Sequence, residues 1–128
     1  MVRVENLSFS YPGDIPAVRD LSVAIDEGER VAIIGPNGSG KSTLARCLNG
    51  LLSPTSGRIE IDGFSTGDAV SILDIRRRLS LVFQNPDDQL VSTTVESEIA
   101  FGLENLGTAH DLMVESVDTP VRRFELER

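Results

Sequence analysis

A glycine-rich segment at residues 35–43 constrains the fold of this chain more than any other feature. Its sequence, GPNGSGKST, matches the phosphate-binding pattern G-x-x-x-x-G-K-[ST]. The apolar, β-branched run at residues 30–34 predicts a buried strand directly before it. After it, four leucines recur at the spacing of one helical face: Leu44, Leu48, Leu51 and Leu52. Strand, loop and helix in this order favour a phosphate-binding loop over the alternative, a glycine-rich turn with a chance lysine.

Each residue type in this loop has a chemical property that suits it to binding phosphate. Glycines allow positive φ angles, so successive N–H groups can turn toward an anion, and the helix N-terminus adds the positive end of its dipole. Lys41 supplies a mobile positive charge for the β- and γ-phosphates, and the Ser42 hydroxyl can ligate Mg²⁺. The candidate phosphate-binding residues are Gly35, Pro36, Asn37, Gly38, Ser39, Gly40, Lys41, Ser42 and Thr43.

The charge, the cysteine content and the lengths of the apolar runs limit the kinds of function that this chain can have. The 128 residues carry a net charge of −8, which argues against a general nucleic-acid or anionic-membrane surface. The single cysteine, Cys47, excludes an internal disulfide and is interpreted as a packing residue. No apolar run approaches the roughly 18 residues of a transmembrane helix. We therefore expect a cytoplasmic location, with any membrane attachment made through a partner.

Two strands are predicted ahead of the loop. Residues 2–10 indicate an edge region of β-structure with Leu7 and Phe9 on one face, and residues 11–14 carry a turn signal. Residues 21–25 alternate between apolar and polar positions as in a half-buried strand. The connections are short, so we expect a small antiparallel sheet against the nucleotide-binding core.

Shorter elements are predicted downstream of the loop. Residues 58–61 and 79–83 indicate strands, the first closed by a turn at residues 62–63, and residues 74–78 indicate a helix. The three arginines at 76–78 are compatible with an anion-binding patch, but a solvated helix end is the favoured interpretation.

The C-terminal third is predicted to be helical. A single helical turn is expected at Asn85–Gln89, and Thr93 with Glu96 forms a capping box that opens a longer helix. Gly107 is expected to end that helix, and its apolar stripe is Val95, Ile99, Leu103 and Leu106.

The tail after Asp111 also has helical spacing, at Met113, Val117, Val121 and Phe124. Pro120 interrupts this pattern, and Thr119 is a candidate N-cap, so two short helical pieces or one kinked helix are predicted. His110, the only histidine, is expected in a surface loop without a catalytic role.

Three segments together resemble the nucleotide-binding subunit of an ABC transporter: Phe9–Tyr11, the loop with Leu44, and Leu81–Gln84. A lone phosphate loop leaves kinases, GTPases and other ATPases open, and the combination favours the ABC type. The run from Gln84 to Leu90, followed by Thr94–Gly102, resembles the ATP-binding protein of energy-coupling-factor importers, which take up vitamins, cobalt or nickel.

The resemblance implies an α/β fold with a P-loop ATPase core and an N-terminal antiparallel β-subdomain over about residues 1–90. Residues from about 91 to 128 are expected to be the start of a helical subdomain, within one incomplete nucleotide-binding domain.

It also implies ATP and Mg²⁺ as cofactors and assigns roles to individual residues. Tyr11 would stack on adenine, although a tyrosine packed on its own sheet is the alternative. Lys41 and Gln84 would be the catalytic residues, and Ser42 and Gln84 would hold the metal. For Gln84, the alternative is a polar residue that caps the end of a strand.

The implied partners are a second ABC ATPase subunit, a transmembrane coupling subunit and a substrate-binding membrane subunit, with no nucleic acid. They would place the protein on the inner face of the cell membrane. The turn at Asn85–Gln89 would face the coupling subunit, and a solvated acidic turn is its alternative.

Several family motifs are not found in this sequence. It has no LSGGQ-like signature, no apolar strand ending in Asp-Glu (the Walker B motif) and no later switch histidine. We therefore expect either the N-terminal part of a longer protein or a truncated product that hydrolyses ATP poorly by itself. Two other functions stay open: a soluble ABC ATPase that does not transport, and a non-catalytic remnant.

Overall fold

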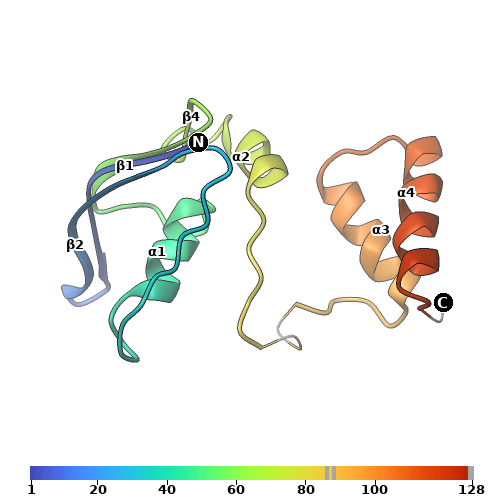
Figure 1. Ribbon diagram of the computed structural model, residues 1–128, viewed down its shortest axis with the longest axis horizontal. Helices are drawn as coiled ribbons and strands as arrows, with labels where there is room; N and C mark the ends of the chain where they lie inside the picture. The colour runs from blue at the N-terminus through green and yellow to red at the C-terminus, as the bar shows by residue number, and fades with distance from the viewer. Residues whose placement is uncertain (86, 88, 127–128) are drawn as a thin grey trace. The chain divides into compact units, whose positions relative to one another are not determined.

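The computed structural model describes residues 1–85, 87 and 89–126. The chain divides into two compact units, Met1–Leu81 and Val82–Arg128 (Figure 1). The first unit contains β1 (Val2–Tyr11), β2 (Ile15–Ile25), α1 (Lys41–Leu48), β3 (Ser56–Ile61), β4 (Phe64–Ser65) and α2 (Ile72–Arg78). The second contains α3 (Val95–Asn105) and α4 (His110–Arg123).

The strands of the first unit form one antiparallel sheet in the order β2-β1-β3-β4. β1 pairs with β2 on one side and with β3 on the other, where Val4 lies opposite Ile59. The prediction that β1 is an edge region is therefore wrong, because β3 returns alongside it from a distant part of the chain. Gly57 permits this approach, since a Cβ there would lie 2.4 Å from the carbonyl oxygen of Asn6.

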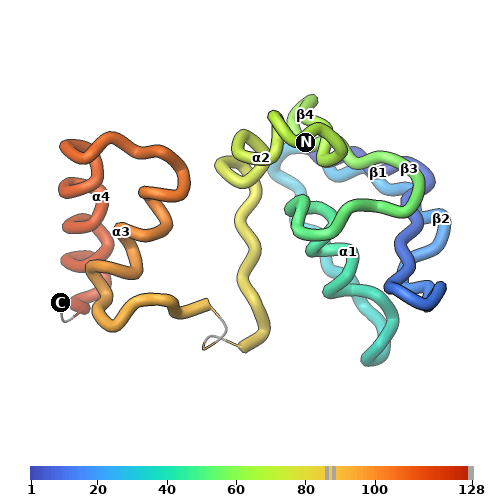
Figure 2. The backbone as a smooth tube through the Cα atoms, turned by 180° about the vertical axis from the view of Figure 1, so that it is seen from behind, coloured from blue at the N-terminus to red at the C-terminus, as the bar shows by residue number. Residues whose placement is uncertain are grey.

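The core of the first unit lies between this sheet and helix α1, which run beside each other in both views (Figures 1 and 2). Leu7 and Phe9 share the buried face, as predicted, and Cys47 of α1 is fully buried, as expected of a packing residue. Burial also raises the pKa of the Cys47 thiol by desolvation. The buried cluster is Val4, Leu7, Phe9, Leu44, Cys47, Ile59, Ile61 and Ile75.

Two predicted strands do not form. Residues 30–34 and 79–83 have no strand assignment, and Ile34 is 93% exposed. Apolar runs of this kind are typical of strands covered on both faces and paired on both edges. In the part of the chain that the structure describes, the sheet is β2-β1-β3-β4 and contains neither run. Both strand predictions are therefore wrong here for lack of pairing partners.

Several boundaries of the other helices and strands in the first unit differ from the predicted ones by a few residues. α1 ends at Leu48 with Asn49 as its C-cap, so Leu51 lies beyond the helix and is exposed. The short strand β4 was not predicted. The predicted strand at 58–61, the turn at 62–63 and the helix at 74–78 are confirmed within β3, the β3–β4 turn and α2.

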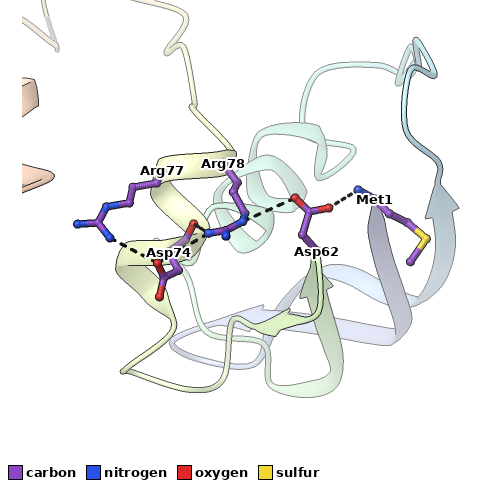
Figure 3. A network of polar contacts seen from close by, with 5 residues as sticks. All are labelled: Met1, Asp62, Asp74, Arg77 and Arg78. Atoms are coloured by element: carbon purple, nitrogen blue, oxygen red, sulfur yellow. Dashed lines mark hydrogen bonds and ion pairs between the residues drawn. The ribbon is translucent and has the colours of Figure 1, made fainter.

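Two of the three arginines at the end of α2, Arg77 and Arg78, lie against acidic groups (Figure 3). Arg78 donates to the backbone oxygen of Asp74 at 2.8 Å, lies 3.9 Å from the Asp62 carboxylate and stacks over the Phe64 ring at 4.4 Å. Arg77 pairs with Asp74, and the amino group of Met1 donates to Asp62, which lowers the pKa of that carboxyl. These contacts favour a solvated helix end, tied to the β3–β4 turn, over an anion-binding patch.

In the second unit α3 begins one residue later than predicted. Thr94, not Thr93, is the N-cap, and its hydroxyl oxygen accepts from the Ser97 N–H at 3.2 Å. The helix ends before Gly107, which has a φ of +71° as expected of a helix-ending glycine. The predicted apolar stripe of α3 is half-buried.

Helix α4 runs without a break in its assignment through Pro120. Thr119 is not an N-cap, because its hydroxyl donates to the backbone oxygen of Glu115 within the same helix. Val117 and Val121 are buried as predicted, whereas Phe124 follows the end of the helix and is exposed. His110 is the first residue of α4, so its predicted loop position is wrong, although its side chain lies at the surface as expected.

The predicted turn at Asn85–Gln89 includes Pro86 and Asp88, which lie outside the described residues. Across the helices of the described residues, none combines the length and apolar character that a membrane crossing needs.

Candidate phosphate-binding loop

The loop at residues 35–43 has the backbone of an anion cradle. Gly38 and Gly40 have φ angles of +82° and +90°, in the left-handed region that favours glycine. The Ser39 N–H donates to the Pro36 oxygen at 3.2 Å, and α1 begins at Lys41 with Gly40 as its N-cap. The loop therefore delivers the chain directly into a helix N-terminus, where free N–H groups and the helix dipole attract anions.

Close packing makes Gly40 necessary. A Cβ at Gly40 would lie 2.2 Å from the carbonyl oxygen of Ala17 in β2, whereas a Cβ at Gly35 would meet only the Ser39 hydroxyl, at 2.7 Å, which can rotate away. Since a backbone oxygen cannot move aside in this way, the loop depends on Gly40 both for its conformation and for its contact with β2.

Lys41 lies over the loop. Its Nζ donates to the carbonyl oxygens of Gly35 at 2.8 Å and Pro36 at 2.7 Å, and reaches the Ser39 Oγ at 3.4 Å. Three oxygens thus hold the ammonium group across the loop, so its positive charge lies at the loop itself.

A cavity of about 410 Å³ lies beside the loop. Its lining includes residues of the loop, among them Lys41, and residues of β2, among them Arg19, together with the apolar Ile33, Ile34 and Leu44. Arg19 is a second cation that the sequence analysis did not single out. The available signal was the short connection between the second strand and the loop, which keeps the two close in space.

Of the other predicted binding residues, Ser42 is exposed on the first turn of α1 and Thr43 is buried. The Tyr11 hydroxyl lies 3.1 Å from Thr43 Oγ1, and the Tyr11 ring packs edge-to-face against Phe9 at 5.0 Å. Tyr11 therefore joins the end of β1 to the start of α1. This geometry supports the alternative interpretation, packing on its own sheet, and its stacking on adenine stays a prediction.

The structure brings Tyr11 and the loop together, but it does not place Gln84 relative to them. Gln84 is exposed and belongs to the second unit. Within the described residues, no group of three or more histidine, cysteine or acidic side chains is arranged to hold a metal ion. A metal at this loop would need ligands from elsewhere, such as phosphate oxygens, beside the Ser42 hydroxyl.

The family model described as ABC transporter matches residues 18–126. The chain belongs to the ABC transporter family. This confirms the predicted resemblance, and the candidate loop at residues 35–43 lies within the matched segment.

Individual relatives agree with this assignment. An energy-coupling factor transporter ATP-binding protein from Enterococcus faecalis is 49% identical over 98% of this chain and 46% of its own length. The solved structure of cbiO1 from Clostridium perfringens, part of the ABC transporter complex cbiONQ, is 36% identical with a TM-score of 0.77, covering 98% of this chain and 51% of its own. This ABC chain thus spans about half the length of these relatives.

A second solved structure is a dimeric ATP-binding cassette in a post-hydrolysis state with ADP and Pi. It is 28% identical with a TM-score of 0.81, covering all of this chain and 59% of its own. These similarities confirm the predicted fold class, an incomplete α/β ABC ATPase domain with an N-terminal antiparallel sheet and following helices.

Proposed function

We propose that this ABC protein is the ATP-binding part of an energy-coupling-factor-type importer. ATP with Mg²⁺ would bind at the loop of residues 35–43, and its hydrolysis would power the uptake of a vitamin or a metal ion. The observation that carries the proposal is the Lys41 ammonium held over a glycine cradle at a helix N-terminus. The names of the relatives support the importer class.

The residues of the loop fit a nucleotide triphosphate. Gly38 has open space where a side chain would lie, so a phosphate group can approach the loop backbone there. Among the described residues, the hydrogen-bond partners of Lys41 are neutral oxygens, two carbonyls and a hydroxyl, and anionic phosphate oxygens are stronger partners for an ammonium group. We infer that Lys41 moves from these oxygens to the β- and γ-phosphates when ATP binds.

Mg²⁺ would neutralise charge on the phosphates during transfer. In this chain the Ser42 hydroxyl and the Gln84 amide oxygen would be its protein ligands, and Gln84 would also orient the attacking water. Tyr11 would stack on adenine, with Lys41 and Gln84 as the catalytic residues. The exposed Ser42 side chain, next to Lys41 at the start of α1, supports its part in this assignment.

The partners follow from the importer class. A second ABC ATPase subunit, a transmembrane coupling subunit and a substrate-binding membrane subunit would hold the protein at the inner face of the cell membrane. Residues 1–90 would then be the β-subdomain with the ATP-binding core, and residues 91–128 the start of the helical subdomain. The exposed Asp87 lies in the segment proposed to meet the coupling subunit.

Lys41→Ala tests the nucleotide site directly. It should weaken ATP binding at least about 100-fold, since it removes a charge-assisted contact to two phosphates. Titration of the purified full-length protein with a fluorescent ATP analogue gives the dissociation constant. Arg46→Ala is the matched control, because Arg46 is a cation on the last turn of the same helix. Unchanged affinity in Lys41→Ala, with the control also unchanged, would show that ATP does not bind at this loop.

A further inference from the structure

Asn49, directly after α1, makes a contact that its capping role does not require. The residue is buried, with 7% exposure, and its side-chain Nδ2 donates to the carbonyl oxygen of Leu79 at 2.6 Å. The backbone N–H of Asn49 caps the helix separately by donating to the Ala45 oxygen. The side chain of Asn49 therefore takes no part in this backbone cap, and its hydrogen bond connects the end of α1 with a segment 30 residues further along the chain.

Leu79 is held at both of its backbone groups. Its N–H donates to the Ile75 oxygen at the end of α2 at 2.8 Å, and its carbonyl accepts from Asn49. Its side chain packs against the buried core cluster. Residues 80–83 then continue without helix or strand to Gln84, five residues after Leu79. Leu79 is thus a fixed point from which the segment leading to Gln84 departs.

The other end of α1 carries the phosphate loop. Gly40 caps the helix and Lys41 is its first residue, so a single helix of eight residues, Lys41–Leu48, separates the loop from Asn49. Such a helix is about 12 Å long and keeps its shape when one end shifts. A displacement of the loop would therefore be carried to the Asn49 amide, and through one hydrogen bond to Leu79.

We propose that Asn49 is a positioning residue that ties the segment leading to Gln84 to the helix carrying the phosphate loop. The proposal rests on the role of Gln84 in the proposed function. Asn49 touches no substrate; it acts by fixing the point from which the Gln84 segment starts. Removing its donor frees the Leu79 carbonyl and lets that starting point move relative to α1.

The test is a double-mutant cycle in the full-length ATPase assembled with its partner subunits. Asn49→Asp keeps the shape of the side chain but replaces the donor with a carboxylate oxygen, and Asn49→Ala removes the donor without adding charge. Each is combined with Gln84→Ala, and kcat and the dissociation constant for ATP are measured. Asn105→Asp is the matched control, because the Asn105 Nδ2 also donates to a backbone oxygen, that of Phe101, at 3.0 Å.

Both Asn49 variants should lower kcat about tenfold, the order expected when a part-buried carbonyl loses its donor. They should leave the ATP dissociation constant unchanged. In the Gln84→Ala background the same substitutions should have no further effect on kcat, because the residue they act through is already gone. Asn105→Asp should change neither quantity.

Three results would overturn the proposal. An equal loss of kcat with and without Gln84, or loss of folding in both Asn49 variants, would assign Asn49 to stability alone. An unchanged kcat in Gln84→Ala would remove the residue on which Asn49 is said to act. That last result would leave ATP binding at the loop intact, since Lys41→Ala tests it independently.

Discussion

Gly40 provides a test of how the phosphate loop is held, because its backbone and its surroundings both exclude a side chain. Its φ is +90°, and an added Cβ would lie 2.2 Å from the carbonyl oxygen of Ala17 in β2. An alanine there must adopt a left-handed conformation and also push the β2 backbone away. Gly13 is the matched control, with a φ of +86° and nothing within 4 Å of an added Cβ.

The expected magnitudes follow from this difference. The left-handed conformation costs an alanine about 1–2 kcal/mol at either position. Relieving the overlap with a backbone atom adds about 1–3 kcal/mol, at Gly40 alone. The change in unfolded-chain entropy is shared by the two substitutions and cancels in the comparison. We therefore expect Gly13→Ala to lower the free energy of unfolding by about 1–2 kcal/mol and Gly40→Ala by about 2–5 kcal/mol.

Urea unfolding of the purified full-length protein measures both values, provided that the dependence on urea is the same for each variant. The same samples should show weakened ATP binding for Gly40→Ala, because a displaced loop no longer directs its N–H groups at the phosphates. Gly13→Ala should leave ATP binding unchanged. Equal losses of stability in the two variants would refute the argument that the contact with Ala17 holds the loop.

Three further contacts can be tested by substitution. Tyr11→Phe removes the hydroxyl group that is hydrogen-bonded to Thr43, and it should cost about 1 kcal/mol of stability while the affinity for ATP is kept. Tyr11→Ala should lower the affinity for ATP if the ring stacks on adenine, and equal affinity in the two variants would exclude stacking. The hydrogen bond and charge of Arg58 lower the pKa of Glu5 below its ordinary value of 4.5. The stability from this pair is therefore present above that pH and is lost as the pH falls through the lowered pKa. Glu5→Gln should remove this part of the pH dependence of the melting temperature, and an unaltered pH profile would contradict the argument. Thr94→Ala should lower the free energy of unfolding in urea by about 1 kcal/mol, because it removes the N-cap of α3, and Thr93→Ala should lower it much less. A larger loss for Thr93→Ala would show that Thr93 is the N-cap.

Local signals account for what the sequence predicted well. The phosphate loop is fixed by its own glycines and by the helix that follows it, and the β1–β2 hairpin by a turn between two alternating runs. These elements depend on residues close to one another in the chain. The same holds for Gly107, which ends α3 through its own positive φ.

The errors in the sheet concern elements whose state depends on distant residues. The apolar runs at 30–34 and 79–83 have the composition of buried strands, but a strand forms only where another strand supplies its hydrogen-bond partners. The interior position of β1 required β3, and no feature of residues 2–10 shows that β3 will return beside them. Within the candidate site, the contact of Tyr11 with Thr43 also joins segments that are 32 residues apart in the sequence.

Because Cys47 is buried, the rate at which a thiol reagent labels it can be used to measure local opening of the fold. It is the only thiol in the chain, it lies between α1 and the sheet, and its raised pKa keeps it in the unreactive protonated form. A thiol reagent can reach it only when α1 separates from the sheet, so the rate of labelling measures how often that opening occurs. Because α1 carries the phosphate loop at its other end, the labelling rate with and without ATP would show whether a bound nucleotide clamps the helix to the sheet.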